Sequence, residues 1–246
     1  MASKSSSIFK YLCIALCALL AVPQLMSCGK DNTTSVGTAN AYLNIVNVSP
    51  NINPVYLYAE FIRQGNTTYR YPSASNYFLM NIADTPLQIR PAVSNNTIQS
   101  NLLTLAERMN RNVRYTWFLT GLRNDSSLTY IFTVDSGAIP AVGRSKIRLV
   151  NASPGSAGLT LTANDTLAFK NIAYKKVSDY KEITAGSYNF KITATSTPGT
   201  VLTTLRNTTV LDGKLYTIYA YGLPNRTDTA AFNAGIILNT IPDKNQ

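Results

Sequence analysis

Two short phrases in this sequence contain residue types that can do chemistry. Residues 46–50 read VNVSP and residues 150–154 read VNASP, so each phrase places a serine directly before a proline. A serine becomes a nucleophile when a neighbouring base activates it, and the usual base is His. The chain contains no His, and no acid or Cys lies near Ser49 or Ser153 in the sequence. We therefore expect the Asn and Ser side chains to bond to nearby backbone and hold a turn, with Pro fixing φ after a strand end.

Carboxylates are a second source of catalytic chemistry, and they are scarce here. The chain has 12 Asp and Glu residues, of which only Glu60, Glu107 and Glu182 are glutamates. A glycosidase needs two carboxylates at a set separation, but these three occupy unmatched positions of an internal repeat. No Asp-rich calcium loop is present, and the lack of His excludes His-ligated metal centres. The sequence predicts a protein that is not an enzyme and that uses no metal and no cofactor.

Tyrosines are the candidate residues for a binding surface. Alternation along predicted strands places three pairs of the 15 tyrosines on common faces, Tyr56–Tyr58, Tyr69–Tyr71 and Tyr219–Tyr221. Tyrosines on an outer face can stack on sugars or offer a flat contact to a protein. We take Tyr69, Tyr71, Tyr219 and Tyr221 as candidate ligand contacts. The alternative is that these faces pack against another sheet.

The first 27 residues are typical of a signal peptide. Lys4 and Lys10 flank a Ser-rich start, and the apolar run over 11–22 is shorter than the roughly 20 residues of a spanning helix. The phrase Leu25-Met26-Ser27-Cys28 resembles the lipobox of bacterial lipoproteins. We therefore predict that Leu25 and Ser27 belong to the processing signal and that Cys28 carries the lipid, since acyl chains anchor a protein stably. An ordinary signal peptide with a chance Cys is the alternative.

Charge and cysteine content agree with an exported protein. The chain has a formal net charge of +10, and removing a signal with two basic residues and no acid leaves 20 minus 12, or +8. Such a surface suits anionic lipid or an acidic glycan, but solubility alone is the simpler explanation of the charge. We expect no nucleic acid partner outside the cytoplasm. The other cysteines, Cys13 and Cys17, lie in the signal, so we expect no disulfide.

The two halves of the remaining chain repeat each other. LNIVNVSPNINPVYLYAEF from Leu43 matches IRLVNASPGSAGLTLTAND from Ile147, residues 71–90 match 174–193, and VRYTWFLTGL from Val113 matches KLYTIYAYGL from Lys214. The offset changes from 104 to 103 to 101, as expected if only loops differ in length. A period of about 100 residues is a domain. We predict a tether over 28–40, domains over 41–136 and 145–240, a linker over 137–144 and a tail over 241–246.

Both halves favour short strands, because alternating Val, Ile, Tyr and Thr are separated by turn phrases such as RQGN, SPGS and LDGK. About seven strands in each half predict an all-β chain of two antiparallel sandwiches, immunoglobulin-like or transthyretin-like. We predict strands over 101–110 and over its counterpart, 201–210. Tyr115 and Tyr216 resemble the tyrosine corner of such sandwiches. Trp117, the single Trp, is expected in the core, with a sugar platform as the alternative.

Three stretches of the second half resemble the family of domain of unknown function 4397. They are KIRLVNASPGSAGLTLTAND, FKNIAYKKVSDYKEITAGSYNFKIT and LDGKLYTIYAYGL, which match that family's strand-end phrase, central motif and closing motif. Residues 144–240 match nearly throughout. Residues 41–136 are a degenerate copy in which Asn112-Val113 replaces Gly213-Lys214. The resemblance implies a β-sandwich of secreted or surface proteins, common in Bacteroidetes-type bacteria, and it implies no catalytic residues.

Two further expectations follow from a bacterium of that type. Such bacteria O-glycosylate exported proteins at Asp-Ser/Thr before a small apolar residue, which makes Thr166 and Thr229 candidate sites. Lys30-Asp31 after Gly29 is similar to a surface-export signal. We therefore expect an outer-membrane lipoprotein at the cell surface, with a periplasm-facing position as the alternative.

The function expected from these patterns is that of a non-catalytic, lipid-anchored binding or adhesion module of the cell envelope. Its partners would be the membrane, through the N-terminal lipid, and a glycan or surface protein. The alternatives are a structural spacer or subunit of a surface assembly, a carbohydrate-binding accessory lipoprotein and, last, an enzyme. The oligomeric state stays open.

Overall fold

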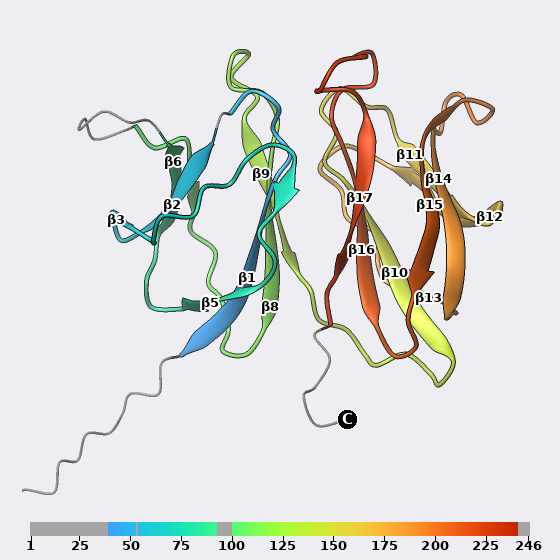
Figure 1. The fold of residues 1–246 in the computed structure, drawn as a ribbon, viewed down its shortest axis with the longest axis horizontal. Helices are drawn as coiled ribbons and strands as arrows, with labels where there is room; N and C mark the ends of the chain where they lie inside the picture. The colour runs from blue at the N-terminus through green and yellow to red at the C-terminus, as the bar shows by residue number, and fades with distance from the viewer. Residues whose placement is uncertain (1–38, 53, 93–99, 241–246) are drawn as a thin grey trace, which may run out of the picture. The chain divides into compact units, whose positions relative to one another are not determined.

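The computed structural model describes residues 39–52, 54–92 and 100–240. Within these ranges the chain is all-β, and its strands form two groups, β1–β9 and β10–β17, each built from two sheets (Figure 1). This confirms the predicted fold of two tandem sandwiches. The described residues contain no helix that could cross a membrane. The predicted signal peptide, most of the tether and the tail lie outside the described residues.

The first sandwich pairs a sheet of five strands with a sheet of four. The larger sheet runs β4–β1–β8–β9 with β5 also on β1, and it contains β1 (Asn40–Asn47), β4 (Ser73–Ala74), β5 (Phe78–Asn81), β8 (Arg114–Thr120) and β9 (Thr129–Val134). The smaller sheet runs β3–β2–β6–β7 and contains β2 (Val55–Ala59), β3 (Ile62–Arg63), β6 (Leu87–Pro91) and β7 (Leu103–Leu105).

The second sandwich repeats this plan with two four-stranded sheets. One runs β13–β10–β16–β17 and contains β10 (Arg144–Asn151), β13 (Lys181–Thr184), β16 (Leu215–Tyr221) and β17 (Asn233–Leu238). The other runs β12–β11–β14–β15 and contains β11 (Leu159–Ala163), β12 (Thr166–Ile172), β14 (Gly186–Ala194) and β15 (Val201–Val210). The first and penultimate strands of each copy pair in parallel, β1 with β8 and β10 with β16, whereas the other described pairs are antiparallel.

The predicted strands over 101–110 and 201–210 differ in the structure. The second is one strand of ten residues, but the first is a strand only at β7. After Leu105 the chain leaves the sheet, because Met109 turns into the core and the amide of Asn110 bonds to Tyr115. Over residues 106–110 these tertiary contacts determine the backbone conformation, although the repeat predicts a strand there.

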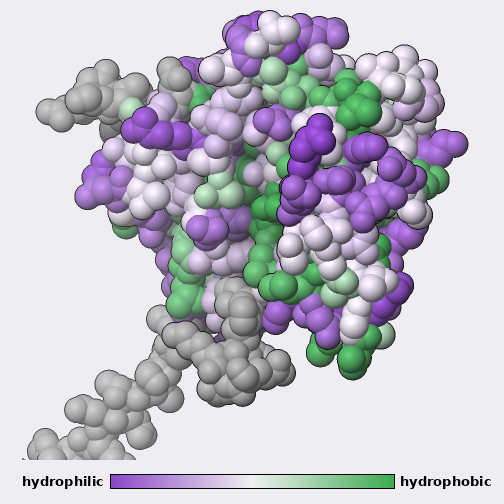
Figure 2. Space-filling model, turned by 45° about the vertical axis from the view of Figure 1, so that its right-hand side comes forward, coloured by the Kyte–Doolittle hydropathy of each residue, from purple (hydrophilic) through white to green (hydrophobic). Residues whose placement is uncertain are grey.

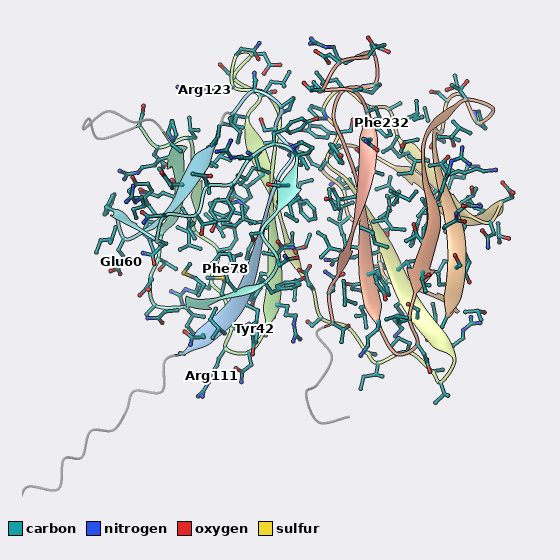
Figure 3. All side chains as sticks on the ribbon, viewed as in Figure 1. Tyr42, Glu60, Phe78, Arg111, Arg123 and Phe232 are labelled. Atoms are coloured by element: carbon teal, nitrogen blue, oxygen red, sulfur yellow. The ribbon has the colours of Figure 1, made fainter. Side chains whose placement is uncertain are left out.

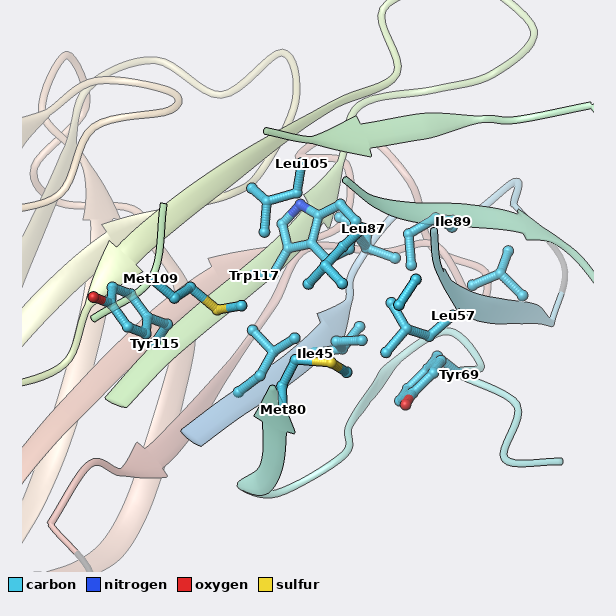
Figure 4. Close-up of a cluster of buried hydrophobic side chains, with 14 of the residues drawn as sticks. Ile45, Leu57, Tyr69, Met80, Leu87, Ile89, Leu105, Met109, Tyr115 and Trp117 are labelled. Carbon is cyan, nitrogen blue, oxygen red and sulfur yellow. The ribbon is translucent and has the colours of Figure 1, made fainter. Parts of the chain in front are cut away.

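Alternation along each strand produces a core between the two sheets of each sandwich. In the first sandwich Ile45, Leu57 and Trp117 belong to this core (Figure 4). Trp117 is fully buried, which confirms its predicted position. Full burial of one large apolar side chain contributes about 1.5–3 kcal/mol.

A third cluster of buried side chains lies between the two sandwiches, and we call it the joint. It is formed by the other faces of β1, β8, β9, β10, β16 and β17 and contains Val46, Val48, Phe118, Ile131, Val150, Ala152, Tyr219 and Ile237. Residues 39–240 therefore belong to one compact unit. The joint explains why β1 and β10 are buried on both faces toward their C-terminal ends: one face meets the sandwich core and the other meets the second copy.

The joint is made by the same face of each copy. Phe118 packs on its own repeat equivalent, Tyr219, with ring centroids 5.5 Å apart. Tyr71 meets Tyr221 at 6.1 Å, and the exchanged pair also meets, since Thr120 Oγ1 lies 3.4 Å from the hydroxyl of Tyr174. Contacts that recur with the two partners exchanged are the signature of an approximate two-fold relation.

A buried ion pair links the two sandwiches at the border of the joint. Arg148 of β10 bonds to Asp135, which directly follows β9, and both side chains are nearly inaccessible. Asp135 also accepts hydrogen bonds from Tyr77 at 2.6 Å, Thr116 at 2.5 Å and Thr133 at 2.7 Å. Burial, followed by the charge and hydrogen bond of Asp135, raises the pKa of Tyr77 far above its usual value. The carboxylate is therefore fully bonded, as a buried charge requires.

Candidate functional site

The two NxSP phrases occupy equivalent places after β1 and β10. The amide of Ser49 donates to Asn47 Oδ1 at 3.1 Å, and its hydroxyl donates to the carbonyl of Gly121 at 2.7 Å. Ser153 repeats the two bonds at 3.1 and 2.6 Å. Both serines are completely buried. The prediction that they hold a turn is confirmed, and each also ties the end of the first strand to the end of the penultimate strand.

The predicted tyrosine corners are also present. The hydroxyl of Tyr115 accepts a hydrogen bond from the amide of Asn110 at 2.8 Å, and that of Tyr216 accepts one from Leu211 at 3.0 Å. Each bond spans five residues and fixes the loop that enters the penultimate strand. These tyrosines therefore have structural roles in both copies.

The four tyrosines taken as candidate ligand contacts do not form an exposed surface. Tyr69 lies in the first core and is 6% exposed (Figure 4), and Tyr219 lies in the joint and is 9% exposed. The prediction is wrong for these two, because the faces that carry them are covered. Tyr71 and Tyr221 are partly buried and pack on each other across the joint. The structure thus uses this set mainly to hold the two sandwiches together.

The candidate modification sites are exposed. Thr166 begins β12, and Thr229 lies in the loop between β16 and β17. Both side chains are open to solvent, so a transferase could reach them, and their glycosylation stays a prediction. The lipobox residues Leu25, Ser27 and Cys28 lie outside the described residues.

Comparison of the two copies locates a different candidate site, on the outer face of the β3–β2–β6–β7 sheet. The residues inside the sandwich are apolar in both copies, but the outward residues differ. The first copy has Tyr56, Tyr58, Phe61, Arg63 and Arg90, which we call the tyrosine–arginine face; the equivalent positions of the second copy hold Thr160, Thr162, Asp165, Leu167 and Thr193. Differences at outward-facing positions of a shared fold point to a function of one copy.

Guanidinium groups order the rings of this face. The guanidinium carbon of Arg63 lies 4.8 Å from the Tyr56 ring centroid, and that of Arg90 lies 4.6 Å from Tyr58 and 5.8 Å from Phe61. Arg90 is held in turn by two bonds to Gln88 Oε1, at 3.2 and 2.6 Å. Cation–π contacts of this kind contribute about 0.5–2 kcal/mol each. The rings of Tyr58 and Phe61 are therefore braced by a buried cation.

The hairpin tip between β2 and β3 is the most exposed part of this face. Ala59 pairs with Ile62, so Glu60 and Phe61 form a two-residue turn, with φ of +47° and +70°. Glu60 lies at the outer end of the first sandwich (Figure 3). Phe61 is 66% exposed and Ile62 is 68% exposed. Two large apolar side chains are thus presented next to Arg63.

The backbone at this tip favours other residues. Turns with positive φ at both central positions prefer Asn, Asp and Gly. The second copy has Asn164 and Asp165 there, with φ of +45° and +64°. A bulky residue with positive φ is uncommon, and the conformation costs about 1–3 kcal/mol. The first copy therefore keeps Phe61 at its tip against the conformational preference of the turn.

The basic side chains of the first sandwich are all arginines. Between residues 39 and 135 the sequence has seven Arg and no Lys, whereas residues 136–240 have four Arg and seven Lys. Arg offers a planar fork of donors that fits carboxylate and sulfate groups, and it stacks on aromatic rings. The tyrosine–arginine face can thus combine an apolar contact with recognition of an anion.

Sequence reasoning missed two features that the repeat itself could have indicated. The unfavourable pair Glu60-Phe61 stands opposite Asn164-Asp165, which marks the hairpin tip. Asp135, predicted at the very end of the first domain with no role, aligns with Asn239, and both residues are buried in the structure. In both cases the signal is a comparison of the copies position by position.

The fold and this arrangement define an all-β protein of two tandem sandwich domains with a copy-specific outer face. The family model of the domain of unknown function DUF4397 matches residues 41–156 and 145–234, so the chain belongs to this family in two tandem copies. A search of curated proteins finds no match to the chain. The family confirms the resemblance found from the sequence and names no activity.

Proposed function

We propose that this protein is a non-catalytic binding module of the cell envelope, held at the outer membrane by lipid on Cys28 and exposed at the cell surface. Its first sandwich would bind a carbohydrate that carries acidic groups, through the tyrosine–arginine face. The observation that supports this proposal is the exposed Phe61, kept in a backbone conformation that its counterpart Asp165 suits better. Strain held at an exposed position points to function rather than to folding.

The ligand class follows from the chemistry of the hairpin tip. One side of the Phe61 ring faces Arg90, and the ring is still largely open to solvent, so a sugar ring can stack on it. Arg63 is exposed beside it and can bond to a carboxylate or sulfate. The rings of Tyr56 and Tyr58 each have one guanidinium over them and are partly buried, so they support the site rather than stack on the sugar.

A glycan array tests the proposal. The probe is the mature chain, residues 28–246, with Cys28→Ala so that it stays in solution. We expect binding to glycans that carry uronate or sulfate, weakened at least tenfold by Phe61→Asn and by Arg63→Gln. The matched control is Asp165→Asn, which changes the equivalent turn of the second copy and should leave binding unchanged.

Two outcomes would remove the carbohydrate ligand. One is silence of the parent protein on every glycan, and the other is binding that Phe61→Asn leaves intact. Binding to neutral glycans alone would contradict the role given to Arg63.

Membrane attachment is tested in cells by fractionation. The parent chain should sediment with membranes, and Cys28→Ala should appear in the soluble fraction, because the lipid is its proposed attachment. Continued sedimentation of Cys28→Ala would overturn the anchor. Loss of the protein from intact cells on mild protease treatment would support its position at the surface.

A further inference from the structure

Two seams run beside the joint, and the repeat relates one to the other. In each seam the last strand of one sandwich lies near the first strand of the other. One seam joins β9 to Arg148 and Tyr180, and we call it the sealed seam. The other joins β17 to their equivalents, Asn44 and Tyr77, and we call it the open seam. Residues at equivalent positions can therefore be compared directly.

The sealed seam is filled by one side chain. Arg148 lies over the Tyr180 ring, 4.7 Å from its centroid, and donates to the carbonyl of Val134 at 2.8 Å. Val134 is the last residue of the edge strand β9, and the bond shows that its carbonyl points away from the sheet into the seam. Arg148 thus supplies a hydrogen-bond donor to the free edge of β9. Covering an edge in this way protects it from pairing with another strand.

The open seam lacks this side chain. Asn44 stands where the second copy has Arg148, and its Nδ2 has no hydrogen-bond partner among the described residues, although Asn44 is buried. A groove of about 340 Å³ takes the place of the missing side chain, between Asn44, Ala74 and Tyr77 on one side and β17 on the other. This volume is within the range of small-ligand pockets. Figure 2 shows a band of hydrophobic residues near the middle of one face of the molecule, with hydrophilic residues on both sides of it.

The free edge of β17 presents backbone groups to this groove. The amide of Asn239 bonds to the carbonyl of Leu215, so in this antiparallel pair every second residue of β17 bonds to β16. The residues between them, Ile236 and Leu238, turn their N–H and C=O groups the other way. Leu238 is the equivalent of Val134, whose carbonyl is bonded in the sealed seam.

The composition of the groove selects the kind of ligand. Apart from Tyr77, its lining has no ionisable side chain, and Ile236, Ile237 and Leu238 form one side of it. A charged ligand would find no opposite charge in the groove, and burying an unpaired charge in a partly buried site costs free energy. A neutral chain with alternating donors and acceptors fits both the apolar lining and the strand edge.

We infer that the open seam binds an extended peptide segment of a partner, which pairs with the free edge of β17 by strand addition. Residues 236–238 span about 7 Å at 3.3–3.4 Å per residue, which matches about three residues of the partner. Main-chain hydrogen bonds to Ile236 and Leu238 give the affinity, and small apolar side chains enter the groove beside Ala74. This site is separate from the tyrosine–arginine face.

The test is a titration of the ¹⁵N-labelled mature chain carrying Cys28→Ala with acetyl-Val-Thr-Val-amide. We expect saturable shifts of the Ile236 and Leu238 amide signals at millimolar peptide. Ala74→Trp fills the groove from an exposed position and should weaken these shifts at least tenfold. The matched control, Val177→Trp, places the same side chain at the equivalent position of the second copy and should leave the titration unchanged.

A second variant, Asn44→Arg, introduces the side chain that seals the equivalent seam, and it should also weaken binding at least tenfold. Its amide spectrum shows whether it folds, and Ala74→Trp carries the test if it does not. The inference is overturned if the parent shows no saturable shift at Ile236 and Leu238, or if Ala74→Trp titrates like the parent. The inference is also overturned if Ala74→Trp and Val177→Trp weaken peptide binding equally.

Discussion

At the scale of single residues, the duplication separates what the fold needs from what one copy adds. Ser49 and Ser153 make the same two bonds, and Tyr115 and Tyr216 fix the same loop. Residues that are the same in chemistry and in contacts in both copies serve the sandwich. Phe61 has no such counterpart, and its backbone conformation disfavours it. Its presence there is the reason why we propose a contact with a ligand outside the domain.

We expect Phe61→Asn to make the protein more stable while it removes binding. Asn tolerates positive φ, so the substitution relieves about 1 kcal/mol of conformational cost, and the lost apolar contact is small because Phe61 is mostly exposed. For a chain of this size the melting temperature should rise by about 2–4 °C. Thermal unfolding followed by circular dichroism measures the change.

The second copy provides the reverse experiment. Asp165→Phe introduces a bulky residue at φ of +64° and should lower stability by a similar amount, with a further small loss from the exposed ion pair to Lys191. A lower melting temperature for Phe61→Asn would show that the turn does not disfavour Phe61.

At the scale of strands, the main feature is that β1 and β10 each serve two cores. Alternate residues of β1 enter the first core and the joint, and β10 does the same for the second core. The ion pair between Asp135 and Arg148 lies at the border of the joint and links the end of β9 to β10. Such a pair contributes less by its own attraction than by the cost of leaving one charge alone.

We therefore expect a large stability loss when one partner is removed. Asp135→Ala leaves Arg148 buried without a carboxylate and should lower the free energy of unfolding by about 3–5 kcal/mol. Arg148→Met together with Asp135→Ala should recover much of this loss, because no uncompensated charge remains. Urea unfolding of the two single variants and the double variant gives the coupling energy. Additive losses would show that the two side chains do not act as a pair.

Much of the fold could be predicted, because it depends on local patterns that occur twice. The repeat, the strand alternation at Leu43 and Ile45, and the NxSP turns are all visible in the sequence. The joint was not predicted, since apolar residues behind them, such as Val46 and Val48, indicate a covered face but not what covers it. That cover comes from residues about 100 positions away. The same gap led to the wrong prediction for Tyr219, whereas Tyr69 is buried in the core of its own sandwich.

The candidate site was predicted only in its chemistry. Aromatic residues on a strand face were expected to bind a ligand, and Tyr56 and Tyr58 were recognised as sharing a face. The exposed tip at Phe61 was not, because exposure depends on where the hairpin ends and on which side of the sheet is covered. These are properties of the assembled sandwich.

At the scale of the whole molecule, the two sandwiches share one compact unit and many buried tyrosines. Burial is the largest cause that raises the pKa of Tyr69, Tyr71, Tyr180 and Tyr219 to about 12, from an ordinary value of 10. Three of these four lie at or beside the joint. A group with a raised pKa in the folded state stabilises that state fully below pH 10, and the contribution is lost as the pH rises toward 12.

We thus expect alkaline conditions to weaken the fold. The melting temperature should change little from tyrosine ionisation below about pH 10 and should fall steeply between pH 10 and 12, since the unfolded chain releases tyrosine protons that the folded chain keeps. Absorbance at the wavelength of tyrosinate should rise in step with unfolding. Complete tyrosine ionisation near pH 10 with the fold intact would contradict the burial of these side chains.

The two-fold character of the joint also limits how such domains can be multiplied. An isologous contact uses the same patch on both partners. The patch of each copy is therefore occupied by the other copy, and none stays free to bind a third copy. A head-to-tail contact would instead leave one unused end and could grow into a filament. The tandem pair is therefore a closed assembly within one polypeptide, and any larger array of these proteins must be built through other surfaces.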